Sequence, residues 1–138
     1  MNYWLIKSEP VKYSWDQFVR DKKTYWNGVR NHQAANNLKA MKVGDRAFFY
    51  HSNEGMEIVG LAEVTRTAYP DPGDEMGKFV MVDVKPIEAA TTPLTLAAIK
   101  ADPKLKEMQL VRQSRLSVCA VTAAEAKQIG KLTGLKNR

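Results

Sequence analysis

Apolar residues recur along the chain in two rhythms, one typical of strands and one typical of helices. Alternating or aromatic and β-branched runs predict strands at residues 3–6, 46–51, 57–67, 78–85 and 116–121. Helical spacing or an N-cap residue predicts helices at residues 14–21, 31–41, 95–100 and 122–134, with a short turn at 104–108. Pro86 is expected to end the fourth strand, because proline cannot donate to a strand ladder.

The central strands follow one another through short turns, whereas helices lie toward both ends of the sequence. This order predicts an α+β fold built around a small curved or barrel-like β-sheet surrounded by helices. No internal repeat, low-complexity tract or linker interrupts the pattern, so a single domain is expected over residues 1–138. A chain of 138 residues is long enough to bury one core without disulfides or metal.

The composition is that of a globular protein, without a membrane span or a disulfide framework. Hydrophobic residues make up 44% and charged residues 26%, values of globular rather than disordered chains. No apolar run is long enough to cross a bilayer, and residues 1–8 lack a signal-peptide pattern, so a cytoplasmic protein without a membrane partner is expected. The single cysteine, Cys119, lies in an alternating run and is predicted to be a core thiol.

The charge balance points weakly to a polyanionic partner. Lys and Arg total 21 against 15 Asp and Glu, which gives a formal net charge of +6. Long-range attraction of this sign suits nucleic acid, although a solvated basic surface without a partner accounts for the charge equally well.

Known catalytic and metal-binding motifs are missing from the sequence. The two histidines, His32 and His51, have no partner at metal-ligand spacing, so no metal and no cofactor is expected. His51 and Ser52 could form half of a nucleophilic pair, but no orienting carboxylate is identified. A histidine that hydrogen-bonds a ligand or a neighbour at the end of its strand is the favoured interpretation.

Polar and aromatic residues gather where the predicted elements end, at residues 7–10, 26–31, 50–53, 69–71 and 112–115. A flat heteroaromatic ligand needs this mixture: an aromatic face to stack on, amides or hydroxyls for its edge, and cations for phosphate. Each residue also has a structural explanation. Trp26 could fill the core beneath a turn, Arg30 could pair with a carboxylate, and Tyr69 could simply shape a loop.

These segments resemble the EVE domain family. The likeness lies in residues 3–10, 26–31, 44–52, 69–71 and 112–118, in the family's order and over nearly the whole chain. The resemblance implies a PUA-like fold related to YTH domains. It also implies recognition of a modified base, flipped or single-stranded, in an aromatic-lined pocket without metal or cofactor. Residues 74–78 depart from the family's aromatic-rich stretch, so no function is carried over there.

The resemblance implies walls for such a pocket. Trp26 would stack on the base, Tyr50 and His51 would close the opposite side, and Tyr69 with Pro70 would form the lip.

It also implies polar contacts. Lys7, Arg30 and Arg115 suit phosphate or a carbonyl oxygen, and Asn31 could offer an amide or free backbone N–H groups to the base edge. The remaining members of the implied base-binding set are Ser8, Val29, Ser52, Asp71 and Ser114.

The leading hypothesis is a bacterial, non-catalytic module that recognises a modified nucleobase in RNA or DNA. Other proteins of a nucleic-acid modification or restriction pathway are further expected partners. The alternative is a small PUA-like hydrolase acting on nucleic acid, with His51, Lys7 and Glu9 recruited for acid–base chemistry. A third hypothesis is a protein-binding adaptor in which the pocket is a relic.

Overall fold

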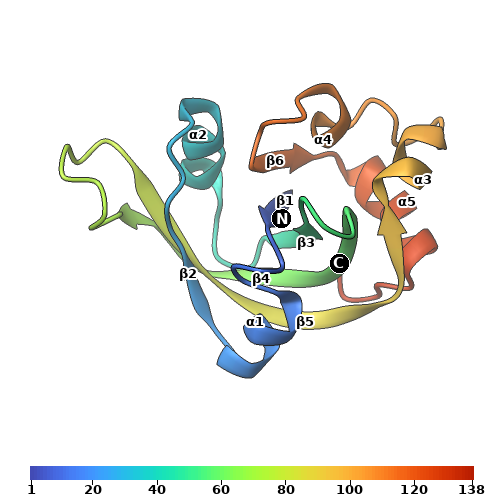
Figure 1. Ribbon diagram of the computed structural model, residues 1–138, viewed down its shortest axis with the longest axis horizontal. Helices are drawn as coiled ribbons and strands as arrows, with labels where there is room; N and C mark the ends of the chain where they lie inside the picture. The colour runs from blue at the N-terminus through green and yellow to red at the C-terminus, as the bar shows by residue number, and fades with distance from the viewer.

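Six strands form one curled sheet in the order β2-β5-β4-β3-β1-β6, with helices packed around it (Figure 1). The computed structural model describes residues 1–138. The strands are β1 Tyr3–Ser8, β2 Thr24–Trp26, β3 Arg46–His51, β4 Glu57–Pro70, β5 Val80–Thr95 and β6 Val118–Val121. The helices are α1 Trp15–Asp21, α2 His32–Ala40, α3 Leu96–Ala101, α4 Gln109–Arg112 and α5 Ala123–Thr133.

The strand pairing explains how distant segments meet. β1 runs parallel to β3 and antiparallel to β6, and the other neighbours are antiparallel. The β1–β3 register sets Lys7 beside Tyr50 and Ser8 beside His51, so two of the predicted polar segments end at the same edge of the sheet. β2 and β6 are the two edge strands and do not pair with each other, so the sheet is curved but not closed.

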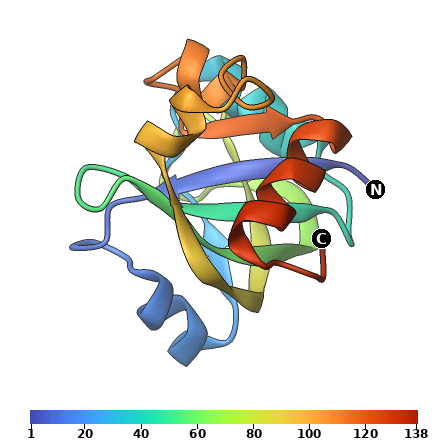
Figure 2. The ribbon, with the colours of Figure 1, turned by 90° about the vertical axis from the view of Figure 1, so that its right-hand side faces the viewer.

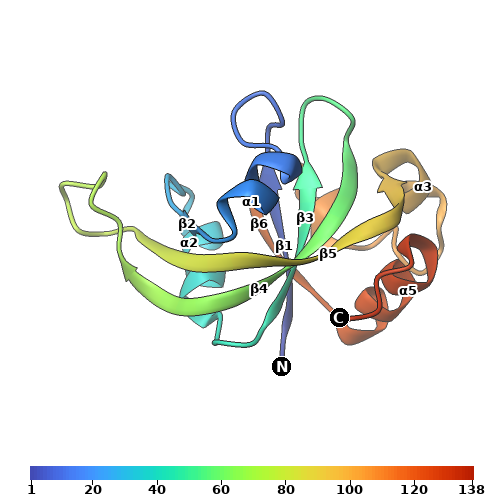
Figure 3. The same cartoon turned by 90° about the horizontal axis from the view of Figure 1, so that it is seen from below.

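The long hairpin of β4 and β5 is irregular and curved. Its register shifts in several places, and each irregularity bends the strands and strengthens their twist. Figure 3 shows the tip of this hairpin at one end of the molecule and α3 and α5 at the other. Figure 2 shows α1 on the opposite side of the curled sheet from α3 and α4.

Pro86 does not end its strand, contrary to the sequence prediction. β5 continues to Thr95, and Pro86 lies opposite Ala62, next to a register shift between Leu61 and Ala62. An irregular position in the backbone hydrogen-bond ladder between two strands tolerates proline, because no N–H is needed there.

Two short elements escaped prediction altogether. β2 has three residues and α4 has four, and neither is long enough to display a period. β2 matters most, because its pairing with β5 sets Trp26 opposite Val82.

An aromatic cluster fills the side of the sheet that carries α1. The rings of Phe18 and Phe49 are stacked with centroids 5.3 Å apart, and Trp15 meets both rings edge-on. Trp15 rests directly on Gly60, where any side chain would overlap the indole. Cys119 is fully buried, as predicted, and burial raises the pKa of its thiol to about 11. None of the helices is long and apolar enough to cross a membrane.

Candidate functional site

A cavity of about 1210 Å³ opens beside the ends of β1 and β3 and is bounded by β2 and by the loop before β6. It brings together part of the predicted set: Lys7, Ser8, Trp26, Tyr50, Ser52, Ser114 and Arg115. The parallel pairing of β1 with β3 creates this arrangement, because equivalent ends of parallel strands lie at one edge of a sheet.

Trp26 forms an aromatic wall of the cavity. Its indole meets Phe49 edge-on at 5.6 Å and Tyr13 edge-on at 6.4 Å between ring centroids. Edge-to-face neighbours on two sides hold the ring in one orientation. Trp26 is only half-buried and lines the cavity, so it is available as a rigid surface for a flat ligand.

Tyr50 contributes an unused hydroxyl. Its side chain is 3% exposed and lines the cavity, yet no protein group hydrogen-bonds to its Oη. Burial raises the pKa of Tyr50, so the phenol keeps its proton near neutral pH and can both donate and accept. The hydroxyl has no protein partner and belongs to a residue that lines the cavity, so an entering ligand can hydrogen-bond to it without breaking a contact.

Lys7 ties the cavity floor to the loop before β6. Its Nζ donates to the Ser114 carbonyl oxygen at 2.9 Å, and its backbone N–H donates to the Ser117 carbonyl oxygen at 3.1 Å. An ammonium group has three donors, so two remain for a ligand. Burial lowers the pKa of Lys7, an effect partly offset by Cys119.

Charged side chains at the cavity differ in whether they are already paired. Lys12 lies 3.3 Å from Glu9, and Asp21 accepts a hydrogen bond from the Tyr13 hydroxyl at 2.9 Å. Arg115 is exposed at the cavity and makes neither an ion pair nor a hydrogen bond through its side chain. It is therefore a cation that an incoming anion can reach without breaking a contact.

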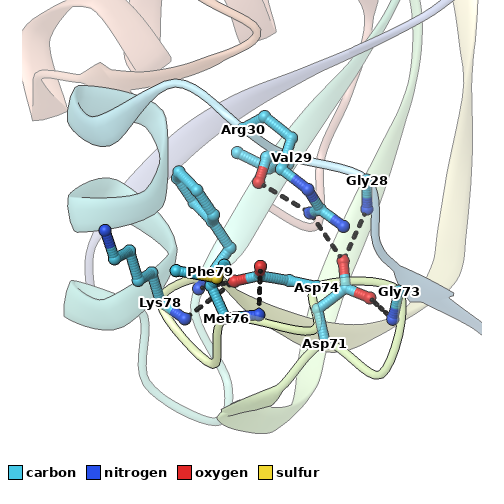
Figure 4. A network of polar contacts seen from close by, with 9 residues as sticks. All are labelled: Gly28, Val29, Arg30, Asp71, Gly73, Asp74, Met76, Lys78 and Phe79. Carbon is cyan, nitrogen blue, oxygen red and sulfur yellow. Dashed lines mark hydrogen bonds and ion pairs between the residues drawn. The ribbon is translucent and has the colours of Figure 1, made fainter.

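The structure places the rest of the predicted set outside this cavity: Val29, Arg30, Asn31, His51, Tyr69, Pro70 and Asp71. Arg30 and Asp71 instead form a polar clasp between the segment after β2 and the tip of the β4–β5 hairpin (Figure 4). Asp71 is 2% exposed and accepts from the Gly28 N–H at 2.9 Å, Arg30 Nη1 at 3.0 Å and the Gly73 N–H at 2.8 Å. Burial alone would raise the pKa of Asp71, but these donors outweigh it and hold that pKa below its ordinary value.

The clasp depends on local backbone geometry. Gly28 has φ of +80°, a conformation that glycine adopts at no steric cost, and this turns its N–H toward Asp71. Below it, Asp74 accepts from the N–H groups of Lys78 and Phe79, each at 2.7 Å (Figure 4). The Arg30 guanidinium also lies 5.5 Å from the centre of the Phe79 ring. Arg30 therefore holds the hairpin tip in place.

One ring nitrogen of His51 already has a structural contact. Its Nε2 accepts the Trp15 N–H at 3.0 Å, and burial lowers the pKa of the imidazole. No carboxylate hydrogen-bonds to the ring, and the side chain does not line the cavity. This geometry does not favour the hydrolase alternative.

The other outlying residues also have structural partners. The Tyr69 hydroxyl donates to Asp83, with the Arg66 guanidinium 3.6 Å from the centre of its ring. Asn31 Oδ1 caps α2 by accepting the Ala34 N–H at 2.9 Å. Val29 is buried in the core, and Pro70 ends β4.

Several lining residues were missed by the sequence analysis, among them Tyr13, Tyr25, Asn27, Met56, Leu96 and Leu110. Asn27 lies inside a segment that was already singled out and could have been included. The others reach the cavity through long-range contacts, such as the Leu96 N–H that donates to the Met56 carbonyl oxygen at 2.8 Å. No group of three or more His, Cys, Asp or Glu side chains is placed to hold a metal ion.

Comparison with known proteins gives a consistent match. The family model described as "EVE domain" matches residues 2–132. Thymocyte nuclear protein 1 of chicken (Gallus gallus) is 36% identical over 157 residues, which cover 89% of this chain and 65% of the relative. The chain thus spans about two-thirds of the length of that relative.

Solved structures agree with this match. A protein of Rhodopseudomonas palustris is 56% identical, with a TM-score of 0.92 over 97% of this chain and 94% of that one. Human THYN1 in complex with DNA containing 5-methylcytosine is 34% identical, with a TM-score of 0.90 over 99% of both chains. The predicted α+β, PUA-like fold is confirmed by this similarity. The chain belongs to the EVE domain family.

Proposed function

We propose that this chain is a non-catalytic module that binds a modified nucleobase of a nucleic-acid strand in the 1210 Å³ cavity. The carrying observation is the pairing, in one cavity, of the fixed indole of Trp26 with the hydroxyl of Tyr50, to which no protein group hydrogen-bonds. The human relative THYN1 has been solved in complex with DNA containing 5-methylcytosine. A methylated cytosine is a flat base, and the Trp26 indole of this cavity offers it a stacking surface. We therefore take 5-methylcytosine as the first base to test.

The two groups have separate tasks. A base stacked on Trp26 gains stacking energy whatever its identity, because every base has a π-face. Tyr50 would then meet an edge of that base, where hydrogen-bond pattern distinguishes one base from another. Stacking supplies affinity and the hydroxyl supplies selectivity.

The cations act on the backbone rather than on the base. Arg115 is unpaired at the cavity, and Lys7 retains donors beyond its bond to Ser114. A phosphate bound by these groups releases counterions, so affinity falls as salt rises. A base that must leave a duplex pays for unstacking, so a single-stranded ligand is expected to bind more tightly than a duplex.

The test compares single-stranded DNA and RNA oligonucleotides that differ only in one central base, cytosine or 5-methylcytosine. The wild-type protein is expected to prefer the methylated base. Tyr50→Phe removes only the hydroxyl and should weaken binding about two- to tenfold, the worth of one hydrogen bond. Tyr3→Phe is the matched control, because Tyr3 stacks on Phe48 outside the cavity.

Equal affinity of wild type for both bases, across DNA and RNA, would contradict the assignment of 5-methylcytosine. Unchanged binding by Tyr50→Phe would contradict the role of the hydroxyl.

The source, location and partners of the protein are further parts of the proposal. Relatives come from bacteria and from eukaryotes, and we propose a bacterial source. A cytoplasmic location, partner proteins and RNA as the natural ligand are likewise proposals, to be tested by fractionation and by the oligonucleotide comparison.

A further inference from the structure

A second, smaller cavity of about 380 Å³ shares a wall with the first. The shared residues are Ser114 and Arg115, which line both cavities. Beyond that wall the polar lining comes from Asn31 and Gln33 at the start of α2 and from Arg112 and Gln113 at the end of α4.

The lining of the smaller cavity is suited to an anion. It contains two guanidinium groups and no carboxylate. Asn31 uses its Oδ1 to cap α2, so its amide nitrogen remains a donor, and Gln33 and Gln113 make no side-chain hydrogen bond. Arg112 has a carboxylate partner outside the cavity, Glu107 at 3.6 Å, but both side chains are 68% exposed and such a pair is weak.

The shared wall is fixed in place. The Ser114 carbonyl oxygen accepts from Lys7 Nζ at 2.9 Å, and the Leu116 N–H donates to the Gln113 carbonyl oxygen at 3.0 Å. A ligand that occupies both cavities must therefore pass over Ser114 and Arg115. In a nucleic-acid strand the group that lies one sugar away from a base is a phosphodiester.

We propose that the smaller cavity binds a phosphodiester next to the nucleotide whose base occupies the larger cavity. This inference rests on the proposed function and adds to it a site for the strand. Arg112 and Arg115 supply charge, and the amides of Asn31, Gln33 and Gln113 supply neutral donors to the phosphate oxygens. The nucleic-acid strand would leave the larger cavity toward the start of α2.

The decisive variant is Gln33→Glu, which puts a carboxylate into the smaller cavity. Gln33 is exposed in the first turn of α2, where a negative charge favours the helix, so the fold should be retained. The matched control is Asn36→Asp, which adds the same charge to an exposed position of the same helix outside both cavities.

The ligands are 5-methyl-2′-deoxycytidine and its 3′- and 5′-monophosphates, measured by titration calorimetry. Wild type and Asn36→Asp are expected to bind one of the two monophosphates at least fivefold more tightly than the nucleoside. Gln33→Glu should lose that gain and bind the nucleoside unchanged. A gain that survives Gln33→Glu, or no gain in wild type, would overturn the phosphate site. Failure of the nucleoside itself to bind wild type would count against the proposed function instead.

A second variant tests the smaller cavity without changing a residue of α2. Arg112→Gln should reduce the slope of log affinity against log salt by about 0.7 for a single-stranded oligonucleotide, the share of one phosphate contact. Arg20→Gln, exposed on α1 and outside both cavities, should leave the slope unchanged. An unchanged slope for Arg112→Gln would remove that residue from the site.

Discussion

The larger cavity and the clasp of Arg30 and Asp71 are both rich in polar side chains, but they differ in what those side chains already bind. In the clasp, both carboxylate oxygens of Asp71 are used by donors of the protein itself. In the cavity, the Tyr50 hydroxyl and the Arg115 guanidinium have no protein partner. Satisfied polar groups stabilise a loop, whereas unsatisfied ones at a cavity are positioned for a ligand.

This difference has an energetic consequence. Removing a group from the clasp leaves buried donors or acceptors without partners, so the free energy of unfolding should fall. Removing the Tyr50 hydroxyl or the Arg115 guanidinium leaves nothing unpaired in the free protein, so the effect should appear in binding. Substitutions in the two regions should therefore affect different measurements.

Asp71→Ala is expected to have the largest effect on stability. It leaves the Gly28 and Gly73 N–H groups and the Arg30 guanidinium without their acceptor. Breaking a buried charge pair costs about 3–5 kcal/mol, and the lower end applies because the Arg30 side chain is 41% exposed. Urea unfolding measures the loss, with Asp16→Ala, at an exposed position of α1, as control. A variant as stable as wild type would show that the clasp is not a structural element.

The sequence predicted the segments of both regions but could not assign their roles. Arg30 and Asp71 are 41 residues apart, and no local pattern reveals that they pair. The same limit applies to the cavity, which exists because β1 lies beside β3 rather than beside its neighbour in the chain. Strand ends were visible in the periodicity, whereas the strand that each one pairs with depends on the folded sheet.

Trp26→Leu should produce the largest effect on binding. Leucine keeps apolar volume against Phe49 and Tyr13 but removes the ring on which a base would stack. Base–aromatic stacking is worth about 1–3 kcal/mol, so affinity for the preferred oligonucleotide should fall roughly tenfold to a hundredfold. Binding must be measured on protein shown to be folded by circular dichroism. A folded variant with wild-type affinity would remove Trp26 from the site.

Trp26 also shows where sequence reasoning succeeds and where it fails. Its segment was singled out for its polar and aromatic residues and then by the family resemblance, yet the strand that carries it was not predicted. Three residues, Thr24–Trp26, are too few to display alternation, and only pairing with β5 makes them a strand.

His51→Gln should change how stability depends on pH. Burial lowers the pKa of His51, so the unfolded chain takes up a proton at a higher pH than the folded protein. Stability is then fully present above about pH 6.5 and decreases as the pH falls from there through the folded pKa. Glutamine can still accept the Trp15 N–H but does not titrate, so this loss should shrink. Thermal melts between pH 7.5 and 5 test it, and a variant that loses as much stability as wild type on acidification would contradict this role of His51.

Arg30→Gln and Arg115→Gln are expected to have the smallest effects, and they separate the two regions most directly. Both residues are arginines from segments that the sequence linked to phosphate, but only Arg115 lies at the cavity. Arg115→Gln should flatten the salt dependence of single-strand binding by about 0.7 in slope and leave the free energy of unfolding unchanged. Arg30→Gln should instead lower the free energy of unfolding and leave the salt slope at the wild-type value. Because the Arg30 side chain is partly exposed, the loss of stability should be limited to roughly 1 kcal/mol. If Arg30→Gln flattened the slope as Arg115→Gln does, the clasp would be part of the phosphate contact. The separation between satisfied and unsatisfied polar groups would then fail as a guide to function in this fold.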